Sequence, residues 1–95
     1  MIEEIKKTII EAKDEIRQQF KAEVKGIFGS YARGDYNENS DLDLLVDFDA
    51  GATLFDLVGV QQYFEDKLGC KVDVVSRRAL REEIRANVFN DLISL

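Results

Sequence analysis

A two-residue alternation of acidic and apolar side chains between residues 41 and 48 is the feature that most constrains the fold. Side chains of a β-strand point alternately to opposite faces of the sheet, so this pattern predicts a strand with one face in the core. Asp41 and Asp43 fall on the opposite face, two residues apart. The predicted core positions of this strand are Leu42, Leu44, Val46 and Phe48.

Helical spacing of apolar residues surrounds this strand, and three helices are expected over about residues 2–21, 54–68 and from 79 onward. The short apolar segments 24–28 and 72–75 are typical of buried strands. The resulting order is helix, strand, short turn or helical turn, strand, helix, strand, helix. It predicts an α/β (α+β) fold, in which helices pack on a small mixed sheet of about three strands.

The connections between these strands indicate how they pair. The polar segment 35–40 suits an antiparallel return, and the helix over 54–68 suits a parallel crossover. Thr53 with Asp56 three residues later resembles a capping box, and Gly69 is a C-terminal helix stop. We expect residues 1–95 to form a single domain, because the chain has the length of one.

The composition excludes several classes of function. The chain has no histidine and one cysteine, which excludes a histidine-based triad, a Cys/His zinc site and an internal disulfide. We do not expect direct binding to nucleic acid, because the formal charge is −6 and nucleic acid is itself negatively charged. No apolar run is long enough for a membrane span and no signal peptide is recognisable, so we expect a cytoplasmic protein without membrane contact.

The pair Asp41 and Asp43 predicts a cation site. Two carboxylates about 4 Å apart, at an effective dielectric constant near 20, repel by roughly 4 kcal/mol. A bound cation or a proton would relieve that repulsion, and oxygen ligands without histidine favour Mg²⁺, with Mn²⁺ as the alternative. A calcium loop is excluded, because Leu45 stands where it needs an oxygen ligand and Val46 where it needs glycine.

Gly29 and Ser30 directly follow the first predicted strand, where small residues allow a phosphate to approach the backbone. Arg33 can donate to a phosphate or to a carboxylate. A Gly-Ser pair alone is as typical of a simple turn, and its weight comes from the Asp pair that follows ten residues later. Asp73 interrupts a run of valines, either on a solvated face or beside the Asp pair. Three carboxylates, a Gly-Ser turn and a cation would form a phosphoryl- or nucleotidyl-transfer site.

Gly29-Ser30, Asp41-x-Asp43 and the distant Asp73 together resemble the nucleotidyltransferase superfamily of DNA polymerase β. The whole chain most resembles the minimal nucleotidyltransferases (MNT proteins), antitoxin or accessory partners of HEPN-domain proteins in prokaryotes. The resemblance implies that Asp41, Asp43 and Asp73 bind metal, two Mg²⁺ ions in all, and that Asp73 also accepts a proton. It further implies that Gly29 and Ser30 cradle a nucleoside triphosphate. From its donor chemistry we expect Arg33 to join them in binding the nucleotide.

The acceptor of the transferred group is left open by the residues. The chain ends about 20 residues after Asp73, so we expect another molecule to present the acceptor. The resemblance implies transfer of AMP from ATP to a tyrosine of a HEPN toxin, which blocks the toxin. The alternatives are an antitoxin that neutralises its partner by stoichiometric docking without catalysis, and a small-molecule nucleotidyltransferase whose cleft is completed in a homo-oligomer.

Two further groups of residues have functional and structural interpretations. Tyr31 and Tyr36 flank the predicted site, where they could stack a nucleobase or simply pack. A cluster of arginines near the C-terminus could neutralise a triphosphate, bind an acidic partner or RNA, or form a solvated helix face. The members of this cluster are Arg77, Arg78, Arg81 and Arg85.

Overall fold

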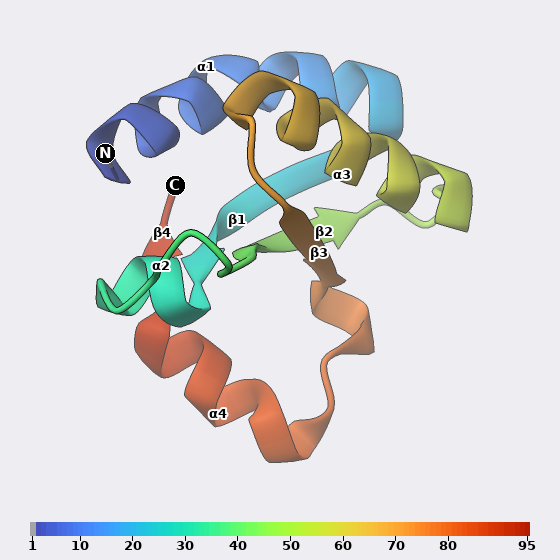
Figure 1. Ribbon diagram of the computed structural model, residues 1–95. Helices are drawn as coiled ribbons and strands as arrows, with labels where there is room; N and C mark the ends of the chain where they lie inside the picture. The colour runs from blue at the N-terminus through green and yellow to red at the C-terminus, as the bar shows by residue number, and fades with distance from the viewer. Residues whose placement is uncertain (1) are drawn as a thin grey trace.

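Helices cover both faces of a four-stranded sheet in the computed structural model, which describes residues 2–95 (Figure 1). Helices α1 and α3 lie together on one face, and α4 lies on the other. The elements in chain order are α1 (Ile2–Phe20), β1 (Ala22–Phe28), α2 (Gly29–Arg33), β2 (Leu42–Phe48), α3 (Leu54–Leu68), β3 (Val72–Ser76), the 3₁₀ turn η1 (Arg77–Ala79), α4 (Glu82–Asp91) and β4 (Ile93–Ser94).

The strands are ordered β3-β2-β1-β4 in one mixed sheet. β1 and β2 are antiparallel, as the polar loop between them predicts, and β2 and β3 are parallel, with α3 as the crossover. The α/β fold and the mixed sheet predicted from the sequence are therefore confirmed. The N-terminus of α3 also carries the expected capping box, in which the Thr53 backbone N–H donates to the Asp56 carboxylate over 2.8 Å.

The main core lies between the sheet and the helices α1 and α3. Ile9 and Ile16 of α1 and Phe64 of α3 are fully buried there against the apolar side of β2. The predicted alternation of β2 is confirmed, because Leu42, Leu44, Val46 and Phe48 all point into this core. Acidic side chains of the same strand are thereby left on the opposite face.

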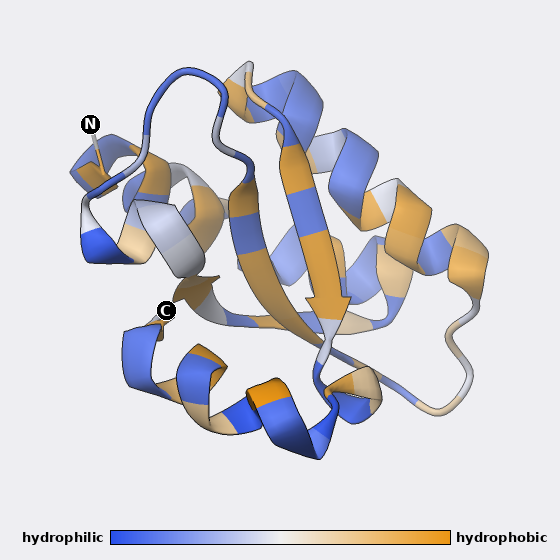
Figure 2. Cartoon of the chain, turned by 60° about the horizontal axis from the view of Figure 1, so that its bottom comes forward, coloured by the Kyte–Doolittle hydropathy of each residue, from blue (hydrophilic) through white to orange (hydrophobic). Residues whose placement is uncertain are grey.

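A smaller apolar cluster fills part of that opposite face under α4. Leu45 of β2, Leu80 and Val88 are buried in it. Figure 2 views the sheet from this side, where hydrophilic bands interrupt the hydrophobic strands beyond the area that α4 covers. The polar part of this face is where Asp43 and Asp73 lie.

The C-terminal segment differs from the sequence prediction. A helix to the end of the chain and about three strands were expected, but α4 ends at Asp91 and Ile93–Ser94 form a fourth strand on β1. A two-residue strand is too short to show a periodicity, and its apolar residues continue the helical spacing of α4. Gly26 of β1 makes this pairing possible, since a Cβ atom there would overlap the carbonyl oxygen of Ile93.

Across residues 2–95, no helix combines the length and the apolar character needed to cross a bilayer. The assignment of residues 1–95 to a single domain stays a prediction.

Candidate functional site

Gly29 brings the turn after β1 into direct contact with an acidic side chain of β2. Phe28, the last residue of β1, is the register partner of Asp43, so the chain turns next to this carboxylate. Gly29 has a φ of 74°, and a Cβ atom at this position would overlap Oδ2 of Asp43. Both the backbone conformation and the available space therefore require glycine here.

Asp43 and Asp73 are register partners across the parallel pair β2 and β3. Neighbouring strands lie about 4.8 Å apart, so these two carboxylates share one face of the sheet as close neighbours. Asp43 is half-buried and Asp73 is exposed. Asp41 is exposed and lies immediately before β2, which begins at Leu42, so it is outside the strand in which the sequence places it.

The environment of Asp43 disfavours its negative charge. Burial raises the pKa of Asp43 from 3.8 to about 6, and the nearby charges of Asp73 and Asp41 act in the same direction. The positive charge of Arg33 lowers this pKa and so offsets part of the rise. The four side chains thus form one electrostatic unit with an excess of negative charge.

The chemistry of these donors fits a hard divalent cation, because all are carboxylate oxygens and a cation would relieve the charge at Asp43. Within residues 2–95, however, no three cysteine, aspartate or glutamate side chains come together as a metal-ligand group. The structure thus places Asp43 next to Asp73, with Asp41 at their edge, and the shared metal site of all three stays a prediction.

Ser30 is the second residue of α2, a helix of five residues whose first backbone amides lack helical partners. Its side chain is half-buried. The backbone carbonyl oxygen of Ser30 accepts hydrogen bonds from the amides of Gly34 and Asp35, over 2.9 and 3.2 Å, which fixes the end of the turn. Of the predicted cradle, Gly29 lies directly against Asp43, and Ser30 follows it in α2.

Arg33 ends α2 and is held by two carboxylates. Its Nε donates to Asp35 over 3.2 Å, and its terminal nitrogen Nη1 donates to Asp91 of α4 over 2.8 Å. A cavity of about 210 Å³ opens between α2 and α4, with Gly29, Arg33 and Asp91 in its lining. Sequence reasoning missed Asp91, because 58 positions separate it from Arg33 and no local pattern connects the two.

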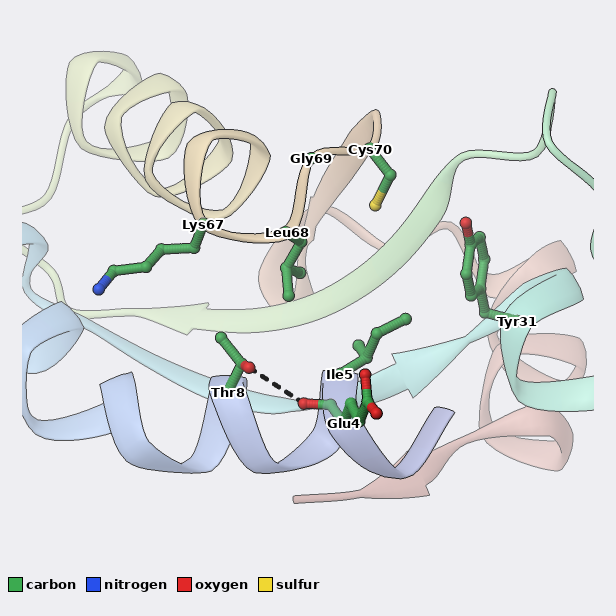
Figure 3. A pocket seen from close by; sticks show the side chains of 8 residues that line it. All are labelled: Glu4, Ile5, Thr8, Tyr31, Lys67, Leu68, Gly69 and Cys70. Carbon is green, nitrogen blue, oxygen red and sulfur yellow. Dashed lines mark hydrogen bonds between the residues drawn. The ribbon is translucent and has the colours of Figure 1, made fainter. Parts of the chain in front are cut away.

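Tyr31 and Tyr36 stack on each other, with ring centroids 4.3 Å apart and planes 6° from parallel. Tyr31 is buried, so these rings pack together rather than stand free for a nucleobase. Tyr31 lines a cavity of about 320 Å³ between α1 and α3, together with Ile5, Leu68 and Cys70 (Figure 3). None of the predicted site residues lines this cavity.

The C-terminal arginine cluster, Arg77, Arg78, Arg81 and Arg85, is exposed throughout. Within the described part of the chain, the cluster forms one ion pair, a loose one between Arg78 Nε and Asp47 Oδ1 at 3.9 Å. This placement fits the interpretation that the arginines form a helix face in contact with solvent. None of them lines the cavity beside Gly29.

Comparison with known proteins identifies the family. The profile of the nucleotidyltransferase domain family matches residues 9–95. The protein adenylyltransferase MntA of Thermococcus cleftensis is 36% identical over 92 residues, which cover 97% of this chain and 93% of the relative. A chain of Methanocaldococcus jannaschii, provisionally named a protein adenylyltransferase, is 32% identical over 93 residues, with 97% and 95% covered.

Solved structures show the same fold. One provisionally described as a minimal nucleotidyltransferase superposes with a TM-score of 0.80 and 39% identity, covering 97% of this chain and 94% of that one. A second, at 19% identity and a TM-score of 0.73, covers 99% of this chain and 71% of that one. It is a complex of an MNT antitoxin with a tri-AMPylated HEPN toxin of Shewanella oneidensis, and at this identity it supports the fold alone.

Proposed function

Because the chain belongs to the nucleotidyltransferase domain family, in its minimal form, we propose that it transfers AMP from ATP to a partner protein in the presence of Mg²⁺. The nucleotidyltransferase activity follows from the family, and the donor, metal and acceptor are the proposal. The observation that supports it most is the contact of Gly29 with the Asp43 carboxylate, beside Asp73.

Asp41, Asp43 and Asp73 would hold up to two Mg²⁺ ions, which supply positive charge for the attacking and leaving oxygens at the α-phosphorus. The acceptor hydroxyl oxygen forms a bond to the α-phosphorus, and the bond to the oxygen that bridges the α- and β-phosphates breaks. Pyrophosphate leaves with the bonding electrons, and the hydroxyl proton passes to the carboxylate of Asp73. Asp73 is assigned this proton because it lies opposite Asp43, on the face of the sheet where the acceptor would approach.

Gly29, Ser30 and Arg33 would bind the triphosphate. The missing side chain of Gly29 lets a phosphate approach the backbone next to Asp43, and the free amides at the start of α2 can donate to its oxygens. The guanidinium of Arg33 offers charge-assisted donors on the side of α4. Their placement supports a phosphate site that adjoins the carboxylates.

A HEPN-domain protein is the proposed acceptor. The support comes from a relative named as a protein adenylyltransferase, which is 36% identical, and from the shared fold with an antitoxin bound to an AMPylated HEPN toxin. The match to the first of these proteins spans nearly the whole length of both chains.

The test is a labelling experiment with ATP that carries a radioactive α-phosphate. The purified protein is incubated with Mg²⁺ and a lysate of its source organism, and the products are resolved on a denaturing gel. We expect a labelled protein band that Asp41→Asn abolishes. Asp47→Asn is the matched control, because Asp47 lies on the same face at the other end of β2 and should keep the label. Label on a small molecule would contradict a protein acceptor.

Neutralisation by docking is the second candidate, and its support is the shared fold with an MNT antitoxin that is in complex with its HEPN toxin. The two are separated by expressing the parent chain or Asp41→Asn at equal levels with the partner toxin. Growth protection that depends on Asp41 supports modification of the toxin. Full protection by the Asp41→Asn variant supports docking instead.

A further inference from the structure

Arg33 is held from two sides by carboxylates that come from different parts of the chain. Asp35 follows it in the loop after α2, and Asp91 reaches it from the last residue of α4. The contact to Asp91 is the shorter, at 2.8 Å against 3.2 Å, and the Asp91 side chain is only 26% exposed. The two acids also raise the pKa of Arg33, the hydrogen bond to Asp91 being the main cause.

The position of Asp91 is unfavourable for helix stability. It ends α4, where the helix dipole is negative, and the last turn of α4 contains no basic residue to compensate. A carboxylate at a helix C-terminus is destabilising, while the same group at an N-terminus would be stabilising. The contact with Arg33 is therefore the favourable interaction that Asp91 makes at this position.

Two anchors fix the chain directly after Asp91. β4 pairs with β1, and the Leu95 amide donates to the Lys25 carbonyl oxygen over 3.0 Å. Lys13 Nζ of α1 donates to the Leu95 carbonyl oxygen over 2.8 Å. A carboxylate with such an anchored backbone can hold the mobile end of an arginine side chain in one orientation.

The two hydrogen bonds leave donors of Arg33 unused. A guanidinium has five N–H donors, and the contacts with Asp35 and Asp91 take one from Nε and one from Nη1. The remaining donors belong to the Arg33 side chain, which lines the cavity beside Gly29. Its positive charge is close enough to Asp43 to lower the pKa of that carboxyl. The guanidinium is thus held by two of its donors while others remain available to an anion.

We infer that Asp91 is a positioning residue, which orients the guanidinium of Arg33 toward the phosphates of the nucleotide bound between α2 and α4. This inference rests on the proposed function, because it needs a nucleoside triphosphate as ligand. Without Asp91, the arginine side chain must lose its rotamer freedom when the nucleotide binds, and this loss weakens binding. Asp91 acts on nucleotide binding through Arg33.

The experiment measures the affinity of the intact protein for the α,β-methylene analogue of ATP with Mg²⁺, by titration calorimetry. We expect Asp91→Ala to weaken binding about threefold to tenfold, the range set by one exposed ion pair together with the ordering of an arginine side chain. Thermal unfolding of the free variant should stay close to that of the parent, since an unfavourable helix charge is removed. A lowered unfolding temperature with unchanged affinity would show a structural role and overturn the inference.

The control variant is Asp49→Ala. It removes a comparable contact, the 2.9 Å hydrogen bond from Arg17 Nη1, which lies outside the proposed nucleotide site. It should bind the analogue as tightly as the parent. In an Arg33→Gln background, Asp91→Ala should have no further effect, because Asp91 acts through Arg33. The loss should also be smaller for AMP than for the triphosphate analogue, a difference that a general weakening of the fold would not produce.

The outcomes separate this inference from the proposed function. If the parent protein fails to bind the analogue at all, the proposed function fails and the inference falls with it. If the parent binds and Asp91→Ala binds equally well, only the inference is wrong. Tighter binding by Asp91→Ala would mean that Asp91 competes with phosphate for Arg33, which also contradicts a positioning role.

Discussion

Asp43 of β2 and Asp73 of β3 lie opposite each other on parallel strands, with their carboxylates on the same face of the sheet. Like charges in this arrangement destabilise the fold unless a proton or a cation compensates them. The raised pKa of Asp43, about 6, reflects partial burial first and this repulsion second. The pair is therefore a feature that the fold tolerates rather than one that stabilises it.

Replacing Asp43 by asparagine should stabilise the metal-free protein at neutral pH. The folded state binds a proton at Asp43 more tightly than the unfolded state, because the pKa rises from 3.8 to about 6 on folding. The parent protein consequently loses stability as the pH rises from about 4 to about 6, and the Asp43→Asn protein does not. A rise of this size corresponds to about 3 kcal/mol in full, which solvent screening of a half-exposed group reduces to about 1 kcal/mol.

Thermal unfolding with a chelator at pH 7 and at pH 4 measures this effect. An advantage of about 1 kcal/mol corresponds to a rise of roughly 4–8 °C in the unfolding temperature for a chain of this size. The advantage should be present at pH 7 and vanish near pH 4. A variant that is less stable than the parent at pH 7 would contradict the electrostatic account of the site.

Addition of Mg²⁺ should reverse the order of stability. A cation that binds only the folded state stabilises it in proportion to the logarithm of its concentration once the site is saturated. The unfolding temperature of the parent should rise with Mg²⁺, and that of Asp43→Asn should stay constant. Asp47→Asn should respond like the parent, since Asp47 lies at the far end of β2. An equal response of all three proteins would show that the ion binds elsewhere.

Replacing Gly29 by alanine should abolish nucleotidyl transfer. The added Cβ overlaps the Asp43 carboxylate and must displace it, and the left-handed backbone costs a further 1–2 kcal/mol or so. Gly69→Ala is the matched control, because Gly69 has a similar φ of 68° but nothing within 4 Å of the new atom. Both variants should lose similar stability from backbone strain, and transfer should survive only in Gly69→Ala. Equal activity of the two variants would exclude a tight contact at Gly29.

The sequence predicts those parts of the fold that depend on neighbouring residues. The alternation through β2 identifies its buried face, and the polar loop and the helix around it predict the directions of strand pairing. Local spacing also identifies the Thr53–Asp56 capping box. In each case the signal lies within a few residues, so the structure and the sequence prediction agree.

The remainder depends on contacts between distant residues. β4 exists because Gly26 admits the backbone of Ile93, a relation that no period in the sequence reveals. The pairing of Arg33 with Asp91 likewise requires α4 to fold back against α2. The sequence also leaves open whether Asp73 faces the Asp pair or solvent, and the register of β3 on β2 brings it opposite Asp43.

The most direct test of nucleotidyl transfer compares ATP labelled at the α-phosphate with ATP labelled at the γ-phosphate. Both are incubated with the purified protein, Mg²⁺ and the HEPN-domain protein that is its proposed partner. Transfer of AMP puts the α-label on the acceptor and leaves the γ-label in pyrophosphate, and Asp43→Asn should abolish the labelling. Appearance of the γ-label on the acceptor would instead reveal phosphoryl transfer and contradict the account of the Gly29–Asp43–Asp73 site.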